Sequence, residues 1–390
     1  MPPPLAGLTV VAIEQAVAAP FATRQLADLG ARVIKIERPD GGDFARSYDT
    51  TVKGLSSYFV WLNRGKLSLT LDLKRPDARR IVERLLARAD VFVENLAPGA
   101  ADRLGLAPAD LTARYARLIA CRITGYGSRG PFAAKKAYDL LVQSETGVID
   151  VTGAGHEAAK VGISVADIAA GMYAYSGILT ALIARQSSGR GTALEVSLFD
   201  ALSEWMSAPD YFTHYGGVPP PRSGAHHATI APYGPHATRD GTVYLGIQNA
   251  REWTRFCREV LEQPALEDDD RFRTNPSRVA HRDQLTTVID SVFSRLGTDD
   301  VIARLERAGI ANAWLRSIGE FRDHPQRTSR WREIDSPAGP LRALVPPLDI
   351  AGVEPVMGAI PGLGEHTDAI LEDLGFDAER VAAWRREGVI

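Results

Sequence analysis

The chain has 390 residues, of which 45% are hydrophobic and 24% are charged. These are ordinary values for a globular protein, and they exclude global disorder. The 45 Lys and Arg residues nearly balance the 48 Asp and Glu residues, so the formal net charge is −3 and gives no electrostatic indication of nucleic-acid binding. At roughly 150 residues per domain, the length predicts two or three domains.

Three further features bear on location and metal content. With two cysteines, Cys121 and Cys257, we expect no disulfide framework, and no Cys/His cluster indicates a metal site. The N-terminus has no Lys or Arg before Arg24, which is untypical of a signal peptide. No uncharged apolar run reaches about 18 residues, so we expect no membrane span. A cytoplasmic location is therefore expected.

The first half of the chain alternates between buried strands and amphipathic helices. A β-branched apolar run at 8–14 predicts a strand, helical spacing of apolar residues predicts a helix over 20–29, and 32–37 predicts a second strand. This order forms a βαβ unit with parallel strands. Further strands are predicted at 66–73, 90–94, 118–124 and 194–198, with helices at 77–89, 107–115 and 167–186. The alternation predicts an α/β fold with a mostly parallel sheet.

The composition changes after about residue 207. Residues 208–235 are rich in Pro, Gly and His, which is typical of a linker or an active-site loop. A hairpin is predicted around 237–246, with Asp240-Gly241 in its turn. Helices are predicted at 251–262, 280–296, 298–308 and 366–374, with a short helix at the C-terminus. This second region is α+β in character.

The opening βαβ unit raises one functional alternative. Its second strand ends at Glu37, where a dinucleotide-binding enzyme places a ribose-binding carboxylate. The turn at 15–20, however, contains no glycine, whereas a pyrophosphate-binding turn needs glycines for close approach of the backbone. We therefore disfavour a nicotinamide or flavin enzyme.

Ordered sequence blocks over nearly the whole chain carry a more specific signal. They read LGARVIKIERP at 29–39, NRGK at 63–66, LDLK at 71–74, VENLAPG at 93–99, GYGSRGP at 125–131, AYD at 137–139, VADIAAG at 165–171 and GEHT at 364–367. In this order and combination they resemble the class III coenzyme A transferases. That superfamily includes the formyl-CoA and carnitine CoA transferases and the α-methylacyl-CoA racemases.

The resemblance implies an α/β fold in which a Rossmann-like large domain is formed from both chain ends, with a smaller α+β domain, in an interlocked homodimer. We assign the large CoA-binding domain to 1–207 and 331–390, a linker or active-site loop to 208–235, and the small α+β domain to 236–330. The implied substrates are coenzyme A, as an acyl-CoA, and a small carboxylic acid. No metal, nucleic acid or membrane is implied as a partner.

In this family the aspartate of the VADIAAG block is the nucleophile, and here it is Asp167. A carboxylate that attacks a thioester forms a mixed anhydride, which CoA thiolate converts into an enzyme–CoA thioester. The local sequence alone favours a simpler role, because Asp167 would also serve as the N-cap of the predicted helix. Both roles are compatible, since a helix N-terminus helps to keep a carboxylate ionised.

Tyr138 bears on the choice of reaction. The racemases of the superfamily carry a histidine directly before the aspartate of this segment, whereas Tyr138 precedes Asp139 here. A tyrosine, with an ordinary pKa near 10, is a poor general base at neutral pH. We therefore favour CoA transfer over racemization or isomerization and expect Tyr138 near the substrate. A protein that binds CoA without catalysis is a further alternative.

The resemblance also implies a set of CoA contacts. They are Ala16, Ala18, Arg38, Leu71, Lys74, Asn95, Arg103 and Lys136. Arg38 matches a position at the nucleotide end, where a guanidinium suits a phosphate. Ala16 and Ala18 lie on the glycine-free turn, which in the family approaches the pantetheine and the reacting centre. Simpler interpretations are helix-start packing for the two alanines and a solvated charge for Lys74.

The loop RSGAHHAT at 222–229 lacks the glycine run that covers the reaction centre in formyl-CoA transferases. It is more similar to the branch that handles C4–C5 dicarboxylates, such as malate, citramalate, mesaconate or itaconate, with succinyl-CoA as donor. Arg222, His226 and His227 are candidates to neutralise a distal carboxylate. The alternatives are a polar loop without substrate contact and, for the reaction, CoA migration within one dicarboxylate.

Overall fold

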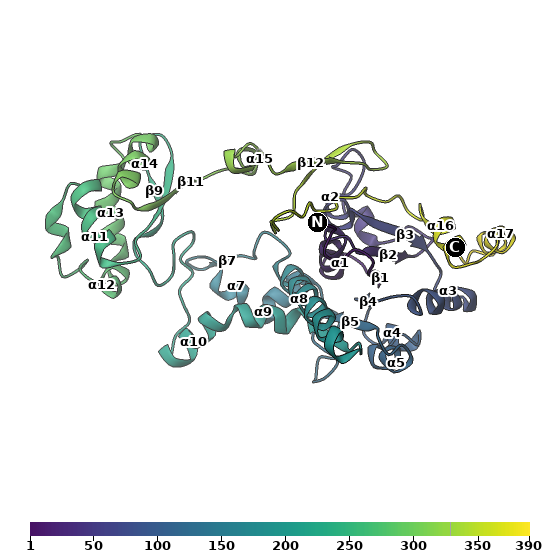
Figure 1. Cartoon of the computed structure of the whole chain (residues 1–390). Helices are drawn as coiled ribbons and strands as arrows, with labels where there is room; N and C mark the ends of the chain where they lie inside the picture. The colour runs from purple at the N-terminus through teal and green to yellow at the C-terminus, as the bar shows by residue number, and fades with distance from the viewer. Residues whose placement is uncertain (328) are drawn as a thin grey trace. The chain divides into compact units, whose positions relative to one another are not determined.

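The computed structural model describes residues 1–327 and 329–390, and Figure 1 shows the course of the chain. The contacts divide these residues into two compact units. The first unit comprises 1–146, 161–206 and 329–390, and the second comprises 147–160 and 207–327. The second unit thus includes 147–160, which the sequence analysis assigned to the large domain, and all of 208–235.

A six-stranded parallel sheet forms the centre of the first unit. Its strands are β1 (Thr9–Ile13), β2 (Arg32–Glu37), β3 (Lys66–Thr70), β4 (Val91–Glu94), β5 (Ile119–Thr124) and β8 (Ala193–Ser197). They follow the order β3-β2-β1-β4-β5-β8, which is the doubly wound order. In such sheets ligands bind outside the carboxyl ends of the strands, where the strand order reverses. Here that point lies between β1 and β4, and the predicted α/β fold is confirmed.

Helices from both chain ends cover this sheet. They include α1 (Ala18–Asp28), α2 (Ser57–Asn63), α3 (Pro76–Leu86), α4 (Ala100–Arg103), α5 (Pro108–Arg114), α6 (Asp139–Glu145), α8 (Val165–Ser188), α9 (Leu198–Trp205), α16 (Thr367–Asp373) and α17 (Ala378–Arg386). The apolar core joins Ile34 and Leu69 of the sheet to Leu85 of α3, Leu371 of α16 and Trp384 of α17. The C-terminal segment therefore completes the domain that the N-terminus begins. A small hairpin, β12 (Trp331–Ile334) with β13 (Leu341–Leu344), also belongs to this unit.

Helix α8 was predicted from residue 167, and it begins two residues earlier, at Val165. By length and composition it is apolar enough to cross a membrane, with a mean hydropathy of 1.3 over 18 residues. That is weak evidence, because core helices of soluble proteins pass the same test. Here α8 packs closely on α1, since a Cβ added at Gly171 would lie 2.7 Å from the carbonyl oxygen of Ala18.

The second unit is built on a three-stranded antiparallel sheet. Its elements are α7 (Val148–Val151), β6 (Gly153–Ala154), β7 (Glu157–Ala158), α10 (Ser207–Gly216), β9 (Tyr233–Ala237), β10 (Thr242–Gly246), α11 (Ala250–Arg255), α12 (Asn275–Ala280), α13 (Arg282–Phe293), α14 (Thr298–Arg307), β11 (Ala311–Trp314) and α15 (Ile318–Arg322). The predicted hairpin with Asp240-Gly241 joins β9 to β10. The core contains Trp253, Phe256 and Phe293. Helix α10 occupies part of the segment that was predicted as a linker, and its residues carried no clear helical period.

Candidate active site

Asp167 lies in the first turn of α8, as its third helical residue, and is half-buried. The side chain of Asp139 caps this helix, because its Oδ1 accepts the N–H groups of Ala166 (2.8 Å) and Asp167 (3.3 Å). The N-cap residue is Ser164. The predicted N-cap role of Asp167 is therefore wrong. Its carboxylate instead lies within the first turn of the helix, beside the carboxylate of Asp139.

Asp139 is fixed in this position by a buried glutamine. Nε2 of Gln143, one turn further along α6, donates to Oδ2 of Asp139 (2.7 Å). Oε1 of the same glutamine accepts the N–H of Val161 (2.9 Å). Gln143 thereby ties α6 to the segment that leads into α8. The distance between Asp139 and the start of α8 is thus set from both sides.

The surroundings of Asp167 change its acidity. Burial, followed by the negative charge of Asp139, raises the pKa of Asp167 to about 7. Both causes disfavour the ionised form. A carboxylate with this pKa is about half ionised at neutral pH and is more basic than an ordinary aspartate. Such a perturbed group is a candidate for catalysis.

The turn after β1 lies at the point where the strand order reverses. Asn95, directly after β4, closes this point with its side-chain amide, which accepts the N–H of Gln15 and donates to the carbonyl of Gln15, both at 2.9 Å. Ala16 follows, and Ala18 begins α1. The contact between Ala18 and Gly171 places the start of α1 against α8, one turn after Asp167. Three predicted residues, Ala16, Ala18 and Asn95, are therefore brought together near Asp167.

Tyr48 also belongs to this neighbourhood, and the sequence analysis did not identify it. Burial, followed by the charges of Asp43 and Asp167, raises the pKa of Tyr48 to about 12. Tyr138 contributes to the same shift, so the three side chains Tyr48, Tyr138 and Asp167 share one environment. The Tyr48 hydroxyl stays protonated and is available as a hydrogen-bond donor. No local pattern around residue 48 signals this role.

Buried charged and polar groups gather at one face of β2 and β3. This cluster is here called the ionic face, and it consists of Glu14, Lys35, Glu37, Asp43, Lys66 and Ser68. Nζ of Lys66 lies 2.6 Å from Oε1 of Glu14, and Nζ of Lys35 lies 2.8 Å from Oδ2 of Asp43. Burial acts to raise the pKa of Glu14, but the charges of Lys66 and Lys35 outweigh it and lower that pKa. The carboxylate of Glu14 is therefore held ionised.

The remaining predicted CoA contacts lie around the carboxyl ends of the strands. Arg38 follows β2, Lys74 follows β3, and Arg103 lies in α4 after β4. These three side chains and Lys136 are exposed. Because the strands are parallel, their carboxyl ends meet at one edge of the sheet, and basic side chains follow several of these ends; Arg38 lies 3.9 Å from Asp40. Leu71, in contrast, is buried in the apolar core and its N–H donates to the carbonyl oxygen of Glu37 (2.8 Å), so in this geometry it is not presented to a ligand.

The three predicted substrate contacts of the second unit have partners within that unit. Arg222 forms an ion pair with Asp150 (2.8 Å). The ring of His227 stacks on Tyr233, with centroids 5.3 Å apart. Burial, followed by the charges of nearby groups, lowers the pKa of His226, so this imidazole is neutral at pH 7. In this geometry Arg222 and His226 do not present free positive charge to a carboxylate.

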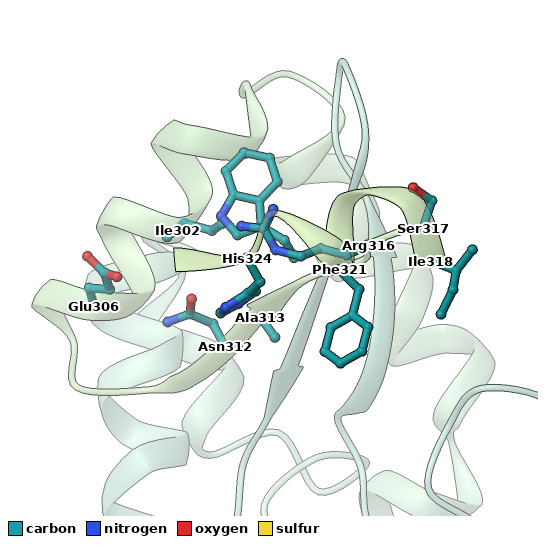
Figure 2. A pocket seen from close by; sticks show the side chains of 10 residues that line it. Ile302, Glu306, Asn312, Ala313, Arg316, Ser317, Ile318, Phe321 and His324 are labelled. Atoms are coloured by element: carbon teal, nitrogen blue, oxygen red, sulfur yellow. The ribbon is translucent and has the colours of Figure 1, made fainter. Parts of the chain in front are cut away.

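The second unit also contains a pocket of about 610 Å³ beside α14 and α15 (Figure 2). Its lining includes Glu306, Asn312, Trp314, Phe321 and His324. No predicted site residue lines this pocket. Within 1–327 and 329–390, no group of three or more His, Cys, Asp or Glu residues is arranged to hold a metal ion.

Comparison with known proteins defines the class to which this site belongs. The family model for CoA-transferase family III matches residues 5–367. The chain therefore belongs to CoA-transferase family III, and the predicted family and enzyme class are confirmed. Coenzyme A as a substrate is consistent with this membership.

Individual relatives cover nearly the whole chain. This chain is 34% identical to the succinate–glutarate CoA-transferase of Agrobacterium fabrum, over 95% of its own length and 96% of the relative. It is 28% identical to the succinyl-CoA–D-citramalate CoA-transferase of Chloroflexus aurantiacus, over 100% of this chain and 98% of the relative. The crystal structure of a CAIB/BAIF family protein from Brucella suis superposes with a TM-score of 0.83 at 34% identity, over 96% of this chain and 100% of that one.

Proposed function

We propose that this enzyme transfers CoA from succinyl-CoA to a short dicarboxylate through covalent intermediates on Asp167. The observation that carries the proposal is the placement of Asp167 in the first turn of α8, with its pKa raised to about 7. A nucleophile with this pKa is available in the ionised form at neutral pH. It is also more basic than a solvated aspartate, which strengthens its attack on a thioester.

The reaction proceeds in four exchanges at carbonyl carbons. An oxygen of Asp167 attacks the thioester of succinyl-CoA, the C–S bond breaks, and CoA thiolate and a succinyl–aspartyl anhydride form. The thiolate attacks the aspartyl carbonyl, and succinate leaves with the electron pair of the broken C–O bond. The acceptor carboxylate then attacks the aspartyl–CoA thioester and expels the thiolate. The thiolate attacks the acceptor carbonyl, which produces the new acyl-CoA and restores Asp167 without oxidation or net proton transfer.

Exposed basic side chains of the first unit support the assignment of CoA as the group that is transferred. CoA carries three phosphate groups, and guanidinium groups recognise phosphate well. Arg38 and Arg103 are exposed near the carboxyl ends of β2 and β4, and Lys74 and Lys136 add positive charge. We propose that these four side chains bind the nucleotide end of CoA, while Ala16 and Asn95 line the path to Asp167.

The acceptor is proposed to be a C4–C5 dicarboxylate. The relatives are named for glutarate and citramalate, which are both five-carbon dicarboxylates. Glutarate is therefore the first acceptor to test. Arg222 and His227 remain proposed substrate contacts, on condition that the substrate displaces their present partners. The interlocked homodimer implied by the family resemblance likewise stays a prediction.

Mass spectrometry of CoA esters tests the proposal. Purified protein is mixed with succinyl-CoA and one free acid at a time: glutarate, itaconate, mesaconate, citramalate, malate, oxalate or carnitine. We expect a new acyl-CoA with at least one dicarboxylate. The Asp167→Ala and Asp167→Asn variants should not form it, whereas Asp110→Ala, at an exposed position of α5, should form it at the wild-type rate.

Two results would contradict the proposal. Full transfer by Asp167→Asn would show that this carboxylate is not the nucleophile. Absence of any new ester, combined with incorporation of deuterium from solvent at the α-carbon of an acyl-CoA, would favour the racemase alternative. If a CoA ester of an unsymmetrical dicarboxylate such as mesaconate is converted into its positional isomer without any added acid, CoA migrates within one dicarboxylate.

A further inference from the structure

Ala16 has a backbone conformation that is unfavourable for an alanine. Its φ is 61°, in the left-handed region, which is unfavourable for a residue with a Cβ atom. Such a conformation persists only when surrounding structure holds it. The N–H of Ala16 donates to Oδ1 of Asp43 (3.0 Å), 27 residues further along the chain. A tertiary contact therefore helps to maintain this turn.

Asp43 is itself held by a buried ion pair. Its Oδ2 lies 2.8 Å from Nζ of Lys35, and neither side chain is exposed. Lys35 also donates to the carbonyl oxygen of Glu14 (3.2 Å), directly before the turn. Oδ1 of Asp43 accepts a second N–H, that of Ala45 (2.9 Å). Lys35 and Asp43 therefore hold the two ends of the turn, while Asn95 holds its middle.

The turn lies next to the nucleophile. The carbonyl of Ala18, two residues after Ala16, is in close contact with Gly171 of α8. Gly171 lies four residues after Asp167, which places both on the same face of the helix. A change in the turn therefore moves the start of α1 relative to the reacting carboxylate.

We infer that Asp43 is a positioning residue of this active site, which holds the turn after β1 through its bond to Ala16 and its buried ion pair with Lys35. The inference rests on the proposed function, because it assigns Asp43 a role in the same transfer reaction. Asp43 does not touch the substrate in this role. It fixes the backbone that faces the nucleophile. An ion pair that contributed only to stability could be weakened without changing the geometry of that backbone.

The test compares two buried aspartates of the same unit. Asp28, at the end of α1, forms ion pairs with Arg24 (2.9 Å) and Arg64 (2.8 Å). Asp43→Asn weakens one buried ion pair and Asp28→Asn weakens two, so both should lower the urea midpoint. We expect kcat per folded molecule to fall at least about tenfold in Asp43→Asn, because small misplacements in an active site are costly. KM for succinyl-CoA should stay within about threefold, and Asp28→Asn should keep kcat within about twofold.

A second pair of variants tests the turn without disturbing the ion pair. Valine at positive φ is strongly disfavoured, whereas glycine adopts this conformation readily. We therefore expect Ala16→Val to lower kcat about as much as Asp43→Asn, and Ala16→Gly to lower it less than Ala16→Val does. These variants decide the question even if Asp43→Asn does not fold.

The outcomes separate this inference from the proposed function. If the wild type forms a new acyl-CoA that Asp167→Asn does not form, the proposed function stands. In that case a wild-type kcat in folded Asp43→Asn or in Ala16→Val, or an equal loss in Asp28→Asn, overturns the inference alone. If the wild type transfers CoA to no acid, the proposed function fails and the inference fails with it.

Discussion

Two carboxylates of the first unit, Glu37 and Asp167, have pKa values that move in opposite directions. On the ionic face, burial acts to raise the pKa of Glu37, but hydrogen bonds from Arg46 and the charge of Lys35 outweigh it and lower that pKa to about 2. At the start of α8, burial and the charge of Asp139 act in the same direction and raise the pKa of Asp167 to about 7. The sign of the neighbouring charge, rather than burial, decides the outcome.

This difference separates carboxylates that stabilise the fold from the carboxylate that we propose as the nucleophile. A carboxylate that is paired with cations contributes to the free energy of folding and stays ionised and unreactive. A carboxylate beside another carboxylate opposes folding when it is ionised, and it is the more basic nucleophile. The ionic face therefore supports the turn after β1, while the start of α8 raises the pKa of Asp167, the proposed nucleophile. Three substitutions test this comparison.

The largest effect is expected from Glu37→Gln. The pKa of Glu37 in the folded protein, about 2, lies below the ordinary value of 4.5. Ionised Glu37 therefore stabilises the fold above pH 4.5, by about 3 kcal/mol, and this contribution is lost as the pH falls from 4.5 to 2. We expect Glu37→Gln to be less stable at pH 7 by about that amount and to lose less stability on acidification.

Urea unfolding at pH 7 and at pH 3 measures this effect. Glu83→Gln, at an exposed position of α3, is the control and should follow the wild type at both values. A Glu37→Gln protein as stable as the wild type at pH 7 would mean that the ion pair with Arg46 (2.7 Å) contributes nothing net to folding.

The opposite change in the free energy of unfolding is expected for Asp167→Asn. The pKa of Asp167 in the folded protein, about 7, lies above its ordinary value of 3.8. Wild-type stability therefore falls as the pH rises from 3.8 to 7, because the folded state binds the proton more tightly than the unfolded state. We expect Asp167→Asn to be more stable than the wild type by about 1–3 kcal/mol at pH 8 and nearly equal at pH 4. It should have lost its transferase activity.

Thermal or urea unfolding of both proteins at the two pH values checks this expectation. Asp110→Asn, exposed on α5, should change neither stability nor activity. If Asp167→Asn loses stability at pH 8, the carboxylate is held by favourable contacts, and the contrast with the ionic face disappears.

Much of the secondary structure around these groups is predictable from the sequence. The strands at 32–37 and 66–73 and the helix at 167–186 were located because the period of apolar residues is a local property. The family blocks led to Asp167 as the candidate nucleophile. The alternation in 66–73 predicts a strand, but it does not predict that the polar face is buried. In the structure Lys66 of that face is buried, because Asn63 of α2 and the backbone of Pro20 in α1 cover it.

The residues that set the acidity and the geometry of the site were not predictable in the same way. Asp139 acts on Asp167 across 28 residues, and Asp43 acts on Ala16 across 27. Neither pair has a spacing that any regular element produces, so no local pattern signals it. Asp139 was present in a family block, but as the neighbour of Tyr138 rather than as the cap of α8. Only the tertiary fold brings these pairs together.

The smallest effect is expected from Asp139→Asn, which removes one charge and keeps the shape. Oδ1 of an asparagine can still accept the N–H groups of Ala166 and Asp167, so the cap of α8 is preserved. Loss of the negative charge should lower the pKa of Asp167. The acidic limb of kcat/KM, which reports the free enzyme, should therefore move to lower pH, by up to about one unit.

A matched control separates the charge of Asp139 from its position. Gln143→Met removes the hydrogen bond to Oδ2 of Asp139 (2.7 Å) but leaves the charge in place. We expect it to reduce kcat by loosening the start of α8, with the acidic limb unchanged. If both variants shift the limb equally, placement sets the acidity of Asp167. If only Asp139→Asn shifts it, the neighbouring charge does, and the same principle that holds Glu37 ionised keeps Asp167 reactive.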